Sequence, residues 1–151
     1  MGAVTRALLL STESRLENVA LVGAAVTGVC DALGLPGEVR AEVELCVVEA
    51  VNNAIEHAYR GEAGHVVEVS IAADAARLVI EVSDRGEPMP AGRLEAARAA
   101  LALPEDPEPP SLESLVDGGR GLAILLGAMD EVRYERAGGR NVLTMVRRIG
   151  G

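Results

Sequence analysis

Three polar residues, Glu49, Asn53 and His57, have types and a spacing that could support chemistry. They recur every four residues, and residues at i, i+4 and i+8 of a helix lie on one side of it. A carboxylate beside a carboxamide offers a proton acceptor next to a neutral oxygen. That pairing suits a hydroxyl nucleophile or a water molecule beside a hard cation such as Mg²⁺. The spacing therefore indicates a candidate site for proton abstraction and metal binding.

The ordinary explanation for polar residues on a helix is a solvent-exposed face. Asn52 and Asn53 do not fit it well, because asparagine amides compete for nearby backbone groups and disfavour a helix interior. A local cost without a local benefit is typical of functional sites. We therefore expect this polar face to carry function.

The helix that must position these residues is predicted over residues 43–59, and its other side is apolar. At about 100° per residue, that side is expected to contain Val47, Val48, Val51, Ala54, Ile55, Ala58 and Tyr59. Gly61 marks the expected end of the helix. The apolar side is therefore predicted to face a core.

An earlier helix is predicted from apolar residues that repeat at three and four between Leu16 and Leu33. Ser14 and Glu17 have the spacing of a capping box at its start. Gly34, followed by a proline two residues later, should end it. Two helices thus come before the main run of strands.

Strands are predicted where the apolar period changes from 3.6 to 2. Residues 67–71 and 78–82 alternate in this way and predict a hairpin, and residues 132–135 and 141–149 predict a second one. Residues 3–10 are apolar enough for a short first strand. This order of elements predicts an α+β fold, a two-layer sandwich with a mostly antiparallel mixed sheet and helices on one face.

Asp84 and Gly86 follow the second predicted strand. An acid and a glycine at a strand end are most often simply a turn. A carboxylate there could instead accept a hydrogen bond from an exocyclic amine, and Gly86 would let a flat ring approach the backbone. Adenine has such an amine, so the pair is a candidate base-binding site.

Glycines 118, 119 and 121 precede an apolar helix predicted over residues 122–129. Glycines before helices are common, but free N–H groups and the helix dipole also make such a start a plausible seat for an anion. Gly119, Arg120 and Gly121 are therefore candidate phosphate-binding residues. Residues 87–117 lie between the two glycine motifs and are rich in proline. A segment of this length is typical of a functional lid or of disorder.

Composition excludes several functions. The net charge of −9 and the presence of only two aromatic residues disfavour direct nucleic-acid binding. All fourteen basic residues are arginine. This excludes the Walker A loop and the ATP-binding strand of ordinary protein kinases, because each needs a lysine that contacts phosphate.

Cys30 and Cys46 fall on or near apolar helix positions and are expected to be buried free thiols. No apolar run is long enough for a signal peptide or a membrane span, so we expect a single cytoplasmic domain over residues 1–151.

The segments VVEAVNNAIEHAY, VSDRG and GGRGLAILLGAMDEVRY, taken in this order, resemble the bacterial anti-sigma factor serine/threonine kinases. These belong to the ATP-binding superfamily shared by gyrase-type ATPases and sensor histidine kinases. The resemblance covers roughly residues 14–148. It implies the histidine kinase-like ATPase fold, ATP and Mg²⁺ as cofactors, and an ATP lid over residues 87–117.

The resemblance also implies a function. Many members hold a sigma factor inactive, and they phosphorylate a serine or threonine of a competing anti-anti-sigma (STAS-type) partner. The motif positions assign Glu49 as the base that orients the hydroxyl, Asn53 as the Mg²⁺ ligand, Asp84 and Gly86 as the adenine site, and Gly119 and Gly121 as the phosphate site. His57 matches a motif position, and either a supporting role or a structural one is open. A homodimer is left open as well.

Two positions depart from the family. Many relatives have a second glycine in the adenine motif where this chain has Pro88, so the shape of the pocket edge is open. A threonine often faces adenine near the last strand, but Arg140 and Asn141 stand at that place and Thr144 lies further on. That role is left unassigned. The arginines that could neutralise phosphate are Arg15, Arg93, Arg98 and Arg120.

Two alternatives to the kinase remain. One is a binding module that sequesters a partner and uses nucleotide only to set the lid, because a rearranged proline-rich lid could keep affinity and lose turnover. The other is the catalytic domain of a sensor histidine kinase, which would need a separate phosphoacceptor helix. A chain of 151 residues is expected to leave no room for that helix.

Overall fold

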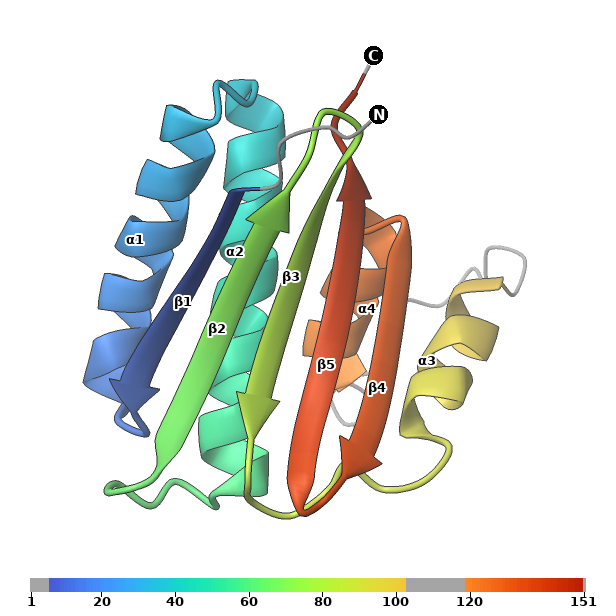
Figure 1. The fold of residues 1–151 in the computed structure, drawn as a ribbon. Coiled ribbons are helices and arrows are strands. Elements are labelled where there is room, and N and C mark those ends of the chain that lie inside the picture. Colours follow the sequence, from blue (N-terminus) through green and yellow to red (C-terminus); the bar gives the residue numbers. More distant parts are fainter. Residues whose placement is uncertain (1–5, 103–118, 151) are drawn as a thin grey trace.

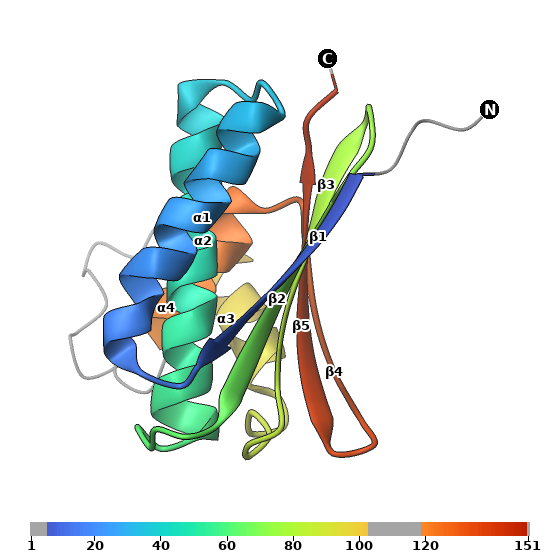
Figure 2. The ribbon, with the colours of Figure 1, turned by 60° about the vertical axis from the view of Figure 1, so that its left-hand side comes forward.

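The computed structural model describes residues 6–102 and 119–150. In this part of the chain, five strands form one sheet with the order β1-β2-β3-β5-β4, and helices pack on one of its faces (Figures 1 and 2). The predicted two-layer α+β sandwich is therefore confirmed. In chain order the elements are β1 (Arg6–Glu13), η1 (Leu16–Asn18), α1 (Val19–Ala32), α2 (Gly37–Asn53), η2 (Ala54–Ala58), β2 (Val66–Ala73), β3 (Arg77–Asp84), α3 (Arg93–Ala102), α4 (Gly119–Ala128), β4 (Glu131–Ala137) and β5 (Arg140–Arg148).

Every pairing in the described sheet is antiparallel, so the expected mixed character is not found. Both predicted hairpins form, β2 with β3 and β4 with β5. The β3–β5 pair joins the two hairpins into one sheet, although α3 and α4 lie between the hairpins in the sequence. Since β3 and β5 are neighbours, the end of β3 lies beside the start of β5, and this places the Asp84 region next to the last hairpin.

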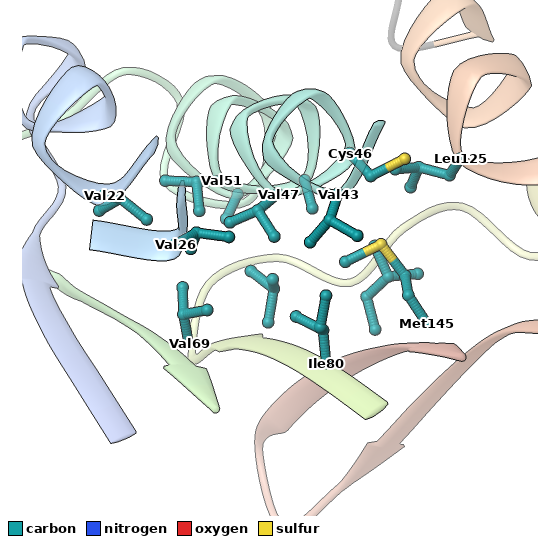
Figure 3. Close-up of a cluster of buried hydrophobic side chains, with 14 of the residues drawn as sticks. Val22, Val26, Val43, Cys46, Val47, Val51, Val69, Ile80, Leu125 and Met145 are labelled. Atoms are coloured by element: carbon teal, nitrogen blue, oxygen red, sulfur yellow. The ribbon is translucent and has the colours of Figure 1, made fainter. Parts of the chain in front are cut away.

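The core lies between the sheet and the helices α1, α2 and α4, and it is almost entirely aliphatic (Figure 3). Valines of α1 and α2 face Val69, Ile80 and Met145 of the sheet, and Leu125 closes the cluster from α4. The side chains that are buried completely include Val26, Val43, Val47, Val51 and Leu125. The apolar side predicted for residues 43–59 is thus the side that packs on the sheet, and the flank of α2 that carries Glu49 and Asn53 lies against α4.

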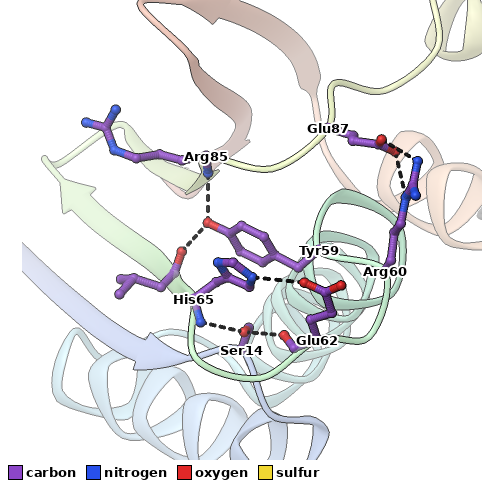
Figure 4. A network of polar contacts seen from close by, with 8 residues as sticks. Ser14, Tyr59, Arg60, Glu62, His65, Arg85 and Glu87 are labelled. Carbon is purple, nitrogen blue, oxygen red and sulfur yellow. Dashed lines mark hydrogen bonds and ion pairs between the residues drawn. The ribbon is translucent and has the colours of Figure 1, made fainter.

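The beginning of the chain differs from prediction. The first strand is described over Arg6–Glu13 and ends three residues after the predicted range 3–10, of which residues 3–5 lie outside the described part. Ser14 does not cap a helix. Its side chain donates to the Glu62 carbonyl oxygen at 2.6 Å and accepts from the His65 N–H at 3.1 Å (Figure 4). Ser14 is 1% exposed, so its hydroxyl needs partners, and the connection between η2 and β2 supplies them.

The long central helix changes its winding directly after Asn53. Residues Ala54–Ala58 form a π-helical turn, and the Tyr59 N–H bonds the Ala54 carbonyl oxygen at 3.0 Å. Arg60 and Gly61 then adopt positive φ angles of 53° and 76°, which reverse the chain as predicted near Gly61. Single π turns inside helices are frequent at functional sites. Here the turn follows the asparagine that sequence analysis singled out.

The segment after β3 contains α3 (Arg93–Ala102), close to the helix that its alanine content suggests. The rest of the predicted lid, from residue 103 to 117, lies outside the described residues. The helix α4 begins at Gly119, so Gly119 and Gly121 belong to its first turn and do not precede it, which corrects the predicted start at residue 122. Gly118 lies outside the described part.

Both cysteines are buried free thiols, as predicted. Burial raises the pKa of Cys46 to about 11, so its thiol stays protonated near neutral pH and is a poor nucleophile. None of the described helices is both long and apolar enough to cross a membrane.

Candidate functional site

A pocket of about 260 Å³ opens between the helical layer and the end of the sheet where β3 stops. It is lined by Asn53 and His57 from the α2–η2 helix and by Asp84 from β3. Its other walls are mostly apolar: Ala50, Ala54, Ala58, Val82, Pro88, Met89, Pro90, Leu122, Tyr134 and Leu143, with Glu87 and Arg93 at the charged positions. Mostly apolar walls with a few convergent polar groups are typical of small-molecule sites.

Glu49 and Asn53 converge on the first turn of α4. A Cβ atom built on Gly121 would lie 3.2 Å from Glu49 Oε2 and 3.1 Å from Asn53 Nδ2. Both side chains are therefore within reach of one point beside the helix start, as their spacing predicted. A side chain at residue 121 would press on both of these groups. Glu49 itself is half-buried and does not line the pocket.

Asp84 lies on the face of β3 that points to the helices, since it continues the alternation of Leu78, Ile80 and Val82. Its Oδ1 accepts the Gly86 N–H at 2.9 Å and the Asn141 Nδ2 at 2.7 Å. Burial raises the pKa of the Asp84 carboxyl, and the two donors and the charge of Arg136 oppose that rise. A half-buried carboxylate held in this way is a strong acceptor for a donor group in the pocket.

Gly86 is required because the chain passes very close to the end of the central helix. A Cβ atom at this position would lie 2.2 Å from the Ala58 carbonyl oxygen. The next residue uses the same carbonyl, since the Glu87 N–H donates to it at 2.8 Å. At the surface, an ion pair between Arg60 and Glu87 also joins the end of η2 to the turn after β3 (Figure 4). The turn after β3 is therefore clamped to the end of η2.

We predict that Gly86→Ala lowers stability, because the added methyl group must push the turn off the Ala58 carbonyl. Overpacking of this kind typically costs about 1–3 kcal/mol. In a chain of this size that corresponds to a fall in melting temperature of several degrees, roughly 2–4 °C for each kcal/mol. Thermal unfolding followed by circular dichroism measures it.

Gly127→Ala is the matched control, since a Cβ atom on Gly127, in the exposed last part of α4, meets nothing within 4 Å. It should leave the melting temperature equal or raise it slightly. Equal melting temperatures for the two variants would mean that the close approach at Gly86 is not needed for stability.

The remaining N–H groups of this turn are bonded by the only two tyrosines of the chain. The Arg85 N–H donates to the Tyr59 hydroxyl at 2.8 Å (Figure 4), and the Met89 N–H donates to the Tyr134 hydroxyl at 2.8 Å. Pro88 has no N–H group, whereas every other residue from Arg85 to Met89 donates its N–H to a partner. A proline can therefore stand where many relatives have glycine without leaving a donor unpaired. The pocket edge is thus a fixed wall, and Pro88 and Met89 are part of it.

Asn141 is the residue that sequence analysis left unassigned and the structure places at the site. It is 1% exposed, pairs with Asp84 across β3 and β5, and its amide donates to Asp84 Oδ1. Thr144 pairs instead with Glu81 and Arg133, on the alternate strand positions and away from Asp84. The register of the last hairpin, counted from its two-glycine turn, was the signal that could have placed Asn141 on the helix-facing side.

The four candidate arginines separate in the structure. Arg93 lines the pocket. Arg15 pairs with Glu13 at the surface, and Arg98 donates to the Val132 carbonyl oxygen. The side chain of Arg120 lies outside the described part, so its role stays a prediction. Arg93 is therefore the arginine best placed to meet a ligand among those that the structure describes.

The sequence of the chain matches a known family and known proteins. The model of the histidine kinase-like ATPase domain matches residues 12–147. The serine-protein kinase RsbW of Staphylococcus epidermidis is 30% identical over 125 residues, which cover 82% of this chain and 75% of that protein.

Two solved structures share the fold. The RsbU and RsbW domains of Rv1364c from Mycobacterium tuberculosis align with a TM-score of 0.66 and 18% identity, covering 95% of this chain and 32% of that longer chain. The SiaB–SiaC complex from Pseudomonas aeruginosa aligns with a TM-score of 0.59 and 15% identity, covering 93% and 89%. With a family model over most of its length and a relative at 30% identity, the chain belongs to the histidine kinase-like ATPase family and, within it, to the serine-protein kinases named RsbW, as the resemblance predicted.

Proposed function

We propose that this protein is an ATP-dependent serine/threonine kinase that phosphorylates an anti-anti-sigma partner of the STAS type and sequesters a sigma factor. The observation that carries the proposal is the convergence of Glu49 and Asn53 on one point at the start of α4, next to the pocket that holds Asp84. A module that only binds nucleotide has less need of a positioned base.

The pocket suits the adenine end of ATP. Asp84 offers an acceptor for an exocyclic amine, and the walls around it are apolar enough to hold a flat ring. The first turn of α4 lies next to Asn53, and its N–H groups, which have no acceptor within the helix, and its positive dipole end suit the negative charge of phosphate. Gly119 and Gly121 are the residues of that turn to which we assign the phosphates.

The donor set also suits Mg²⁺. The ion prefers oxygen ligands and usually keeps several waters, and in nucleotide sites it is held by one or two protein groups together with phosphates. Asn53 offers an amide oxygen and Glu49 a carboxylate nearby. The described residues contain no group of three or more His, Cys, Asp or Glu side chains that could hold a metal ion.

Phosphoryl transfer asks the protein mainly for positioning and for compensation of charge. We assign to Glu49 the role of accepting the proton of the incoming serine or threonine hydroxyl. Asn53 would hold the metal, and Asp84 with Gly86 would orient the base. Bound ATP supplies the phosphoryl group, and Mg²⁺ neutralises the charge that develops on it.

The partners follow from the family. The relative from Staphylococcus epidermidis is named a serine-protein kinase, and one protein of the same fold was solved in a complex, SiaB with SiaC. We therefore propose that residues 1–151 act as one kinase domain on a regulatory protein in the cytoplasm, without direct nucleic-acid contact. The net charge of −9 supports that last point.

The test has two stages. Calorimetric titration with ATP and with ADP, each with and without Mg²⁺, should show binding that depends on Mg²⁺. Incubation with radiolabelled ATP and a STAS-type partner should then place one phosphate on a serine or threonine of that partner. Absence of nucleotide binding under every condition would overturn the site, and binding without transfer to any such partner would overturn the kinase assignment.

A second function is a binding module that uses nucleotide without turnover. It is favoured by the position of Gly121, since the first turn of α4 lies against the Glu49 carboxylate that would have to accept the proton. Stoichiometric phosphate on a partner protein would exclude this function.

A further inference from the structure

A chain of hydrogen bonds crosses three strands at the bottom of the pocket (strands in Figure 1). Arg136 on β4, Asn141 on β5 and Asp84 on β3 are direct cross-strand neighbours. Arg136 Nη1 donates to Asn141 Oδ1 at 2.9 Å, and Asn141 Nδ2 donates to Asp84 Oδ1 at 2.7 Å. Only the last of the three residues lines the pocket.

The direction of this chain is fixed by chemistry. A guanidinium has donors and no acceptor, so Arg136 forces the carbonyl oxygen of the Asn141 amide to face it. The NH₂ group of Asn141 must then face Asp84. Asn141 is 1% exposed, so water does not offer it an easy alternative partner. The orientation of one buried amide is therefore set by a residue that does not touch the pocket.

The consequence falls on Asp84. Its Oδ1 receives two N–H groups, from Gly86 and from Asn141, and neither can accept a proton in return. In the described part of the chain, Gly86 and Asn141 both donate to Oδ1 of Asp84, so its other oxygen, Oδ2, is left for a ligand. Donors on a carboxylate favour its ionised form and oppose the effect of burial on its pKa. An ionised Asp84 accepts hydrogen bonds and has no proton to donate.

We propose that Arg136 and Asn141 are specificity-determining residues, which act as a relay that makes Asp84 an obligate acceptor and so selects a 6-aminopurine over a 6-oxopurine. The inference rests on the proposed nucleotide site. Neither residue is a catalytic residue in this proposal, because both act through Asp84. A 6-amino group donates to Asp84, whereas a 6-oxo group places a second acceptor against it.

A purely structural role is the competing explanation. Arg136 and Asn141 both also donate to the Gly86 carbonyl oxygen, at 3.2 Å and 3.1 Å, so they hold the turn in place as well. Loss of that support would weaken binding of any purine nucleotide by a similar factor. The relay instead predicts a change in the ratio of two affinities, which support alone would not move.

The experiment compares ATP with inosine triphosphate, which carries the 6-oxo group, by calorimetric titration at saturating Mg²⁺. Parent protein should favour ATP by roughly 10- to 100-fold, the range for a hydrogen bond to a charged group. Arg136→Glu reverses the polarity at the start of the relay, and Asn141→Leu removes its middle. Both should bring the ratio toward one.

Two further variants are controls. Arg136→Lys keeps a donor and should keep most of the ratio. Arg140→Glu makes the same change of charge one strand position away, where the arginine donates to the Ser83 hydroxyl and not to the relay, and it should leave the ratio unchanged. Because both nucleotides are measured on the same sample, a partly unfolded variant loses active fraction for both and the ratio stays valid.

The outcomes separate the two proposals. If the parent binds neither nucleotide, the proposed nucleotide site is wrong and the relay falls with it. If the parent binds ATP but does not discriminate, or if Arg136→Glu and Asn141→Leu keep the parental ratio, the site stands and the relay is wrong. A ratio that falls in those two variants and survives in both controls supports it.

Discussion

Glu49→Gln should lower the rate of phosphoryl transfer to the partner protein by roughly 10²- to 10⁴-fold, the range that a general base contributes. Nucleotide affinity should change little, since Glu49 does not line the pocket that receives the base. Glutamine keeps the size of the side chain and removes only its ability to take a proton. Single-turnover transfer from radiolabelled ATP, together with calorimetric titration of each variant, measures both quantities.

Glu56→Gln is the matched control for this prediction. Glu56 lies on the same helical stretch and is exposed, so the same chemical change there should leave transfer and affinity unaltered. A rate for Glu49→Gln within a few fold of the parent would remove Glu49 from the role of base. A large loss of nucleotide affinity in that variant would point instead to a role in holding the metal.

The sheet and the helices could be predicted because their signals are local. The alternation in β2 and β3 sets which side chains face the core, and the turn at Asp74 is fixed by its carboxylate, which accepts the N–H groups of Ala76 and Arg77 at 2.8 Å and 2.9 Å. The apolar side of α2 is set in the same way by helical periodicity. Such features depend on neighbours in sequence, so one sequence suffices to find them.

The errors arose where a residue's partner is distant in sequence. Ser14 has capping-box spacing, yet its hydroxyl bonds Glu62 and His65, about fifty residues away, because that contact satisfies a buried group. The start of α4 at Gly119 is similar, since glycines have a low helix propensity and packing against α2 overrides it. Local spacing gives no information about either contact.

The candidate site shows the same division. Glu49, Asn53 and Asp84 were identified by type and spacing, and the structure gathers Glu49 and Asn53 at Gly121 and both Asn53 and Asp84 at one pocket. Asn141 and Arg136 were not assigned, because their importance depends on the register between β3, β5 and β4. Motifs locate the groups that touch a ligand, and register locates the groups that orient them.

Asp84→Asn should lower the affinity for ATP by roughly 10- to 100-fold, because an amide replaces the charged acceptor. The melting temperature should stay equal or rise. Burial raises the pKa of Asp84, which means that its ionised form is less favourable in the folded protein than in the unfolded chain. That cost is present at pH values above the folded-state pKa, and removing the charge removes it.

The raised pKa of Asp84 also sets how ATP binding depends on pH. The parent should bind ATP fully above the raised pKa of Asp84 and lose affinity as the pH falls through it, whereas Asp84→Asn should lack this loss. His57 lines the same pocket, so the comparison is repeated in a His57→Gln background. Of the other charged groups near Asp84, Arg136 donates to Asn141 Oδ1, and Glu87 pairs with Arg60.

A gain or retention of stability combined with a loss of binding is the signature of a residue kept for function, since a purely structural carboxylate would show the opposite. Glu49 gives no such test, because its variant is judged by the rate of transfer and by nucleotide affinity, without a stability measurement. Asp84 is therefore the residue at which stability and affinity must move apart. If Asp84→Asn both unfolds more easily and still binds ATP as the parent does, then Asp84 serves the turn after β3 and the base must bind elsewhere.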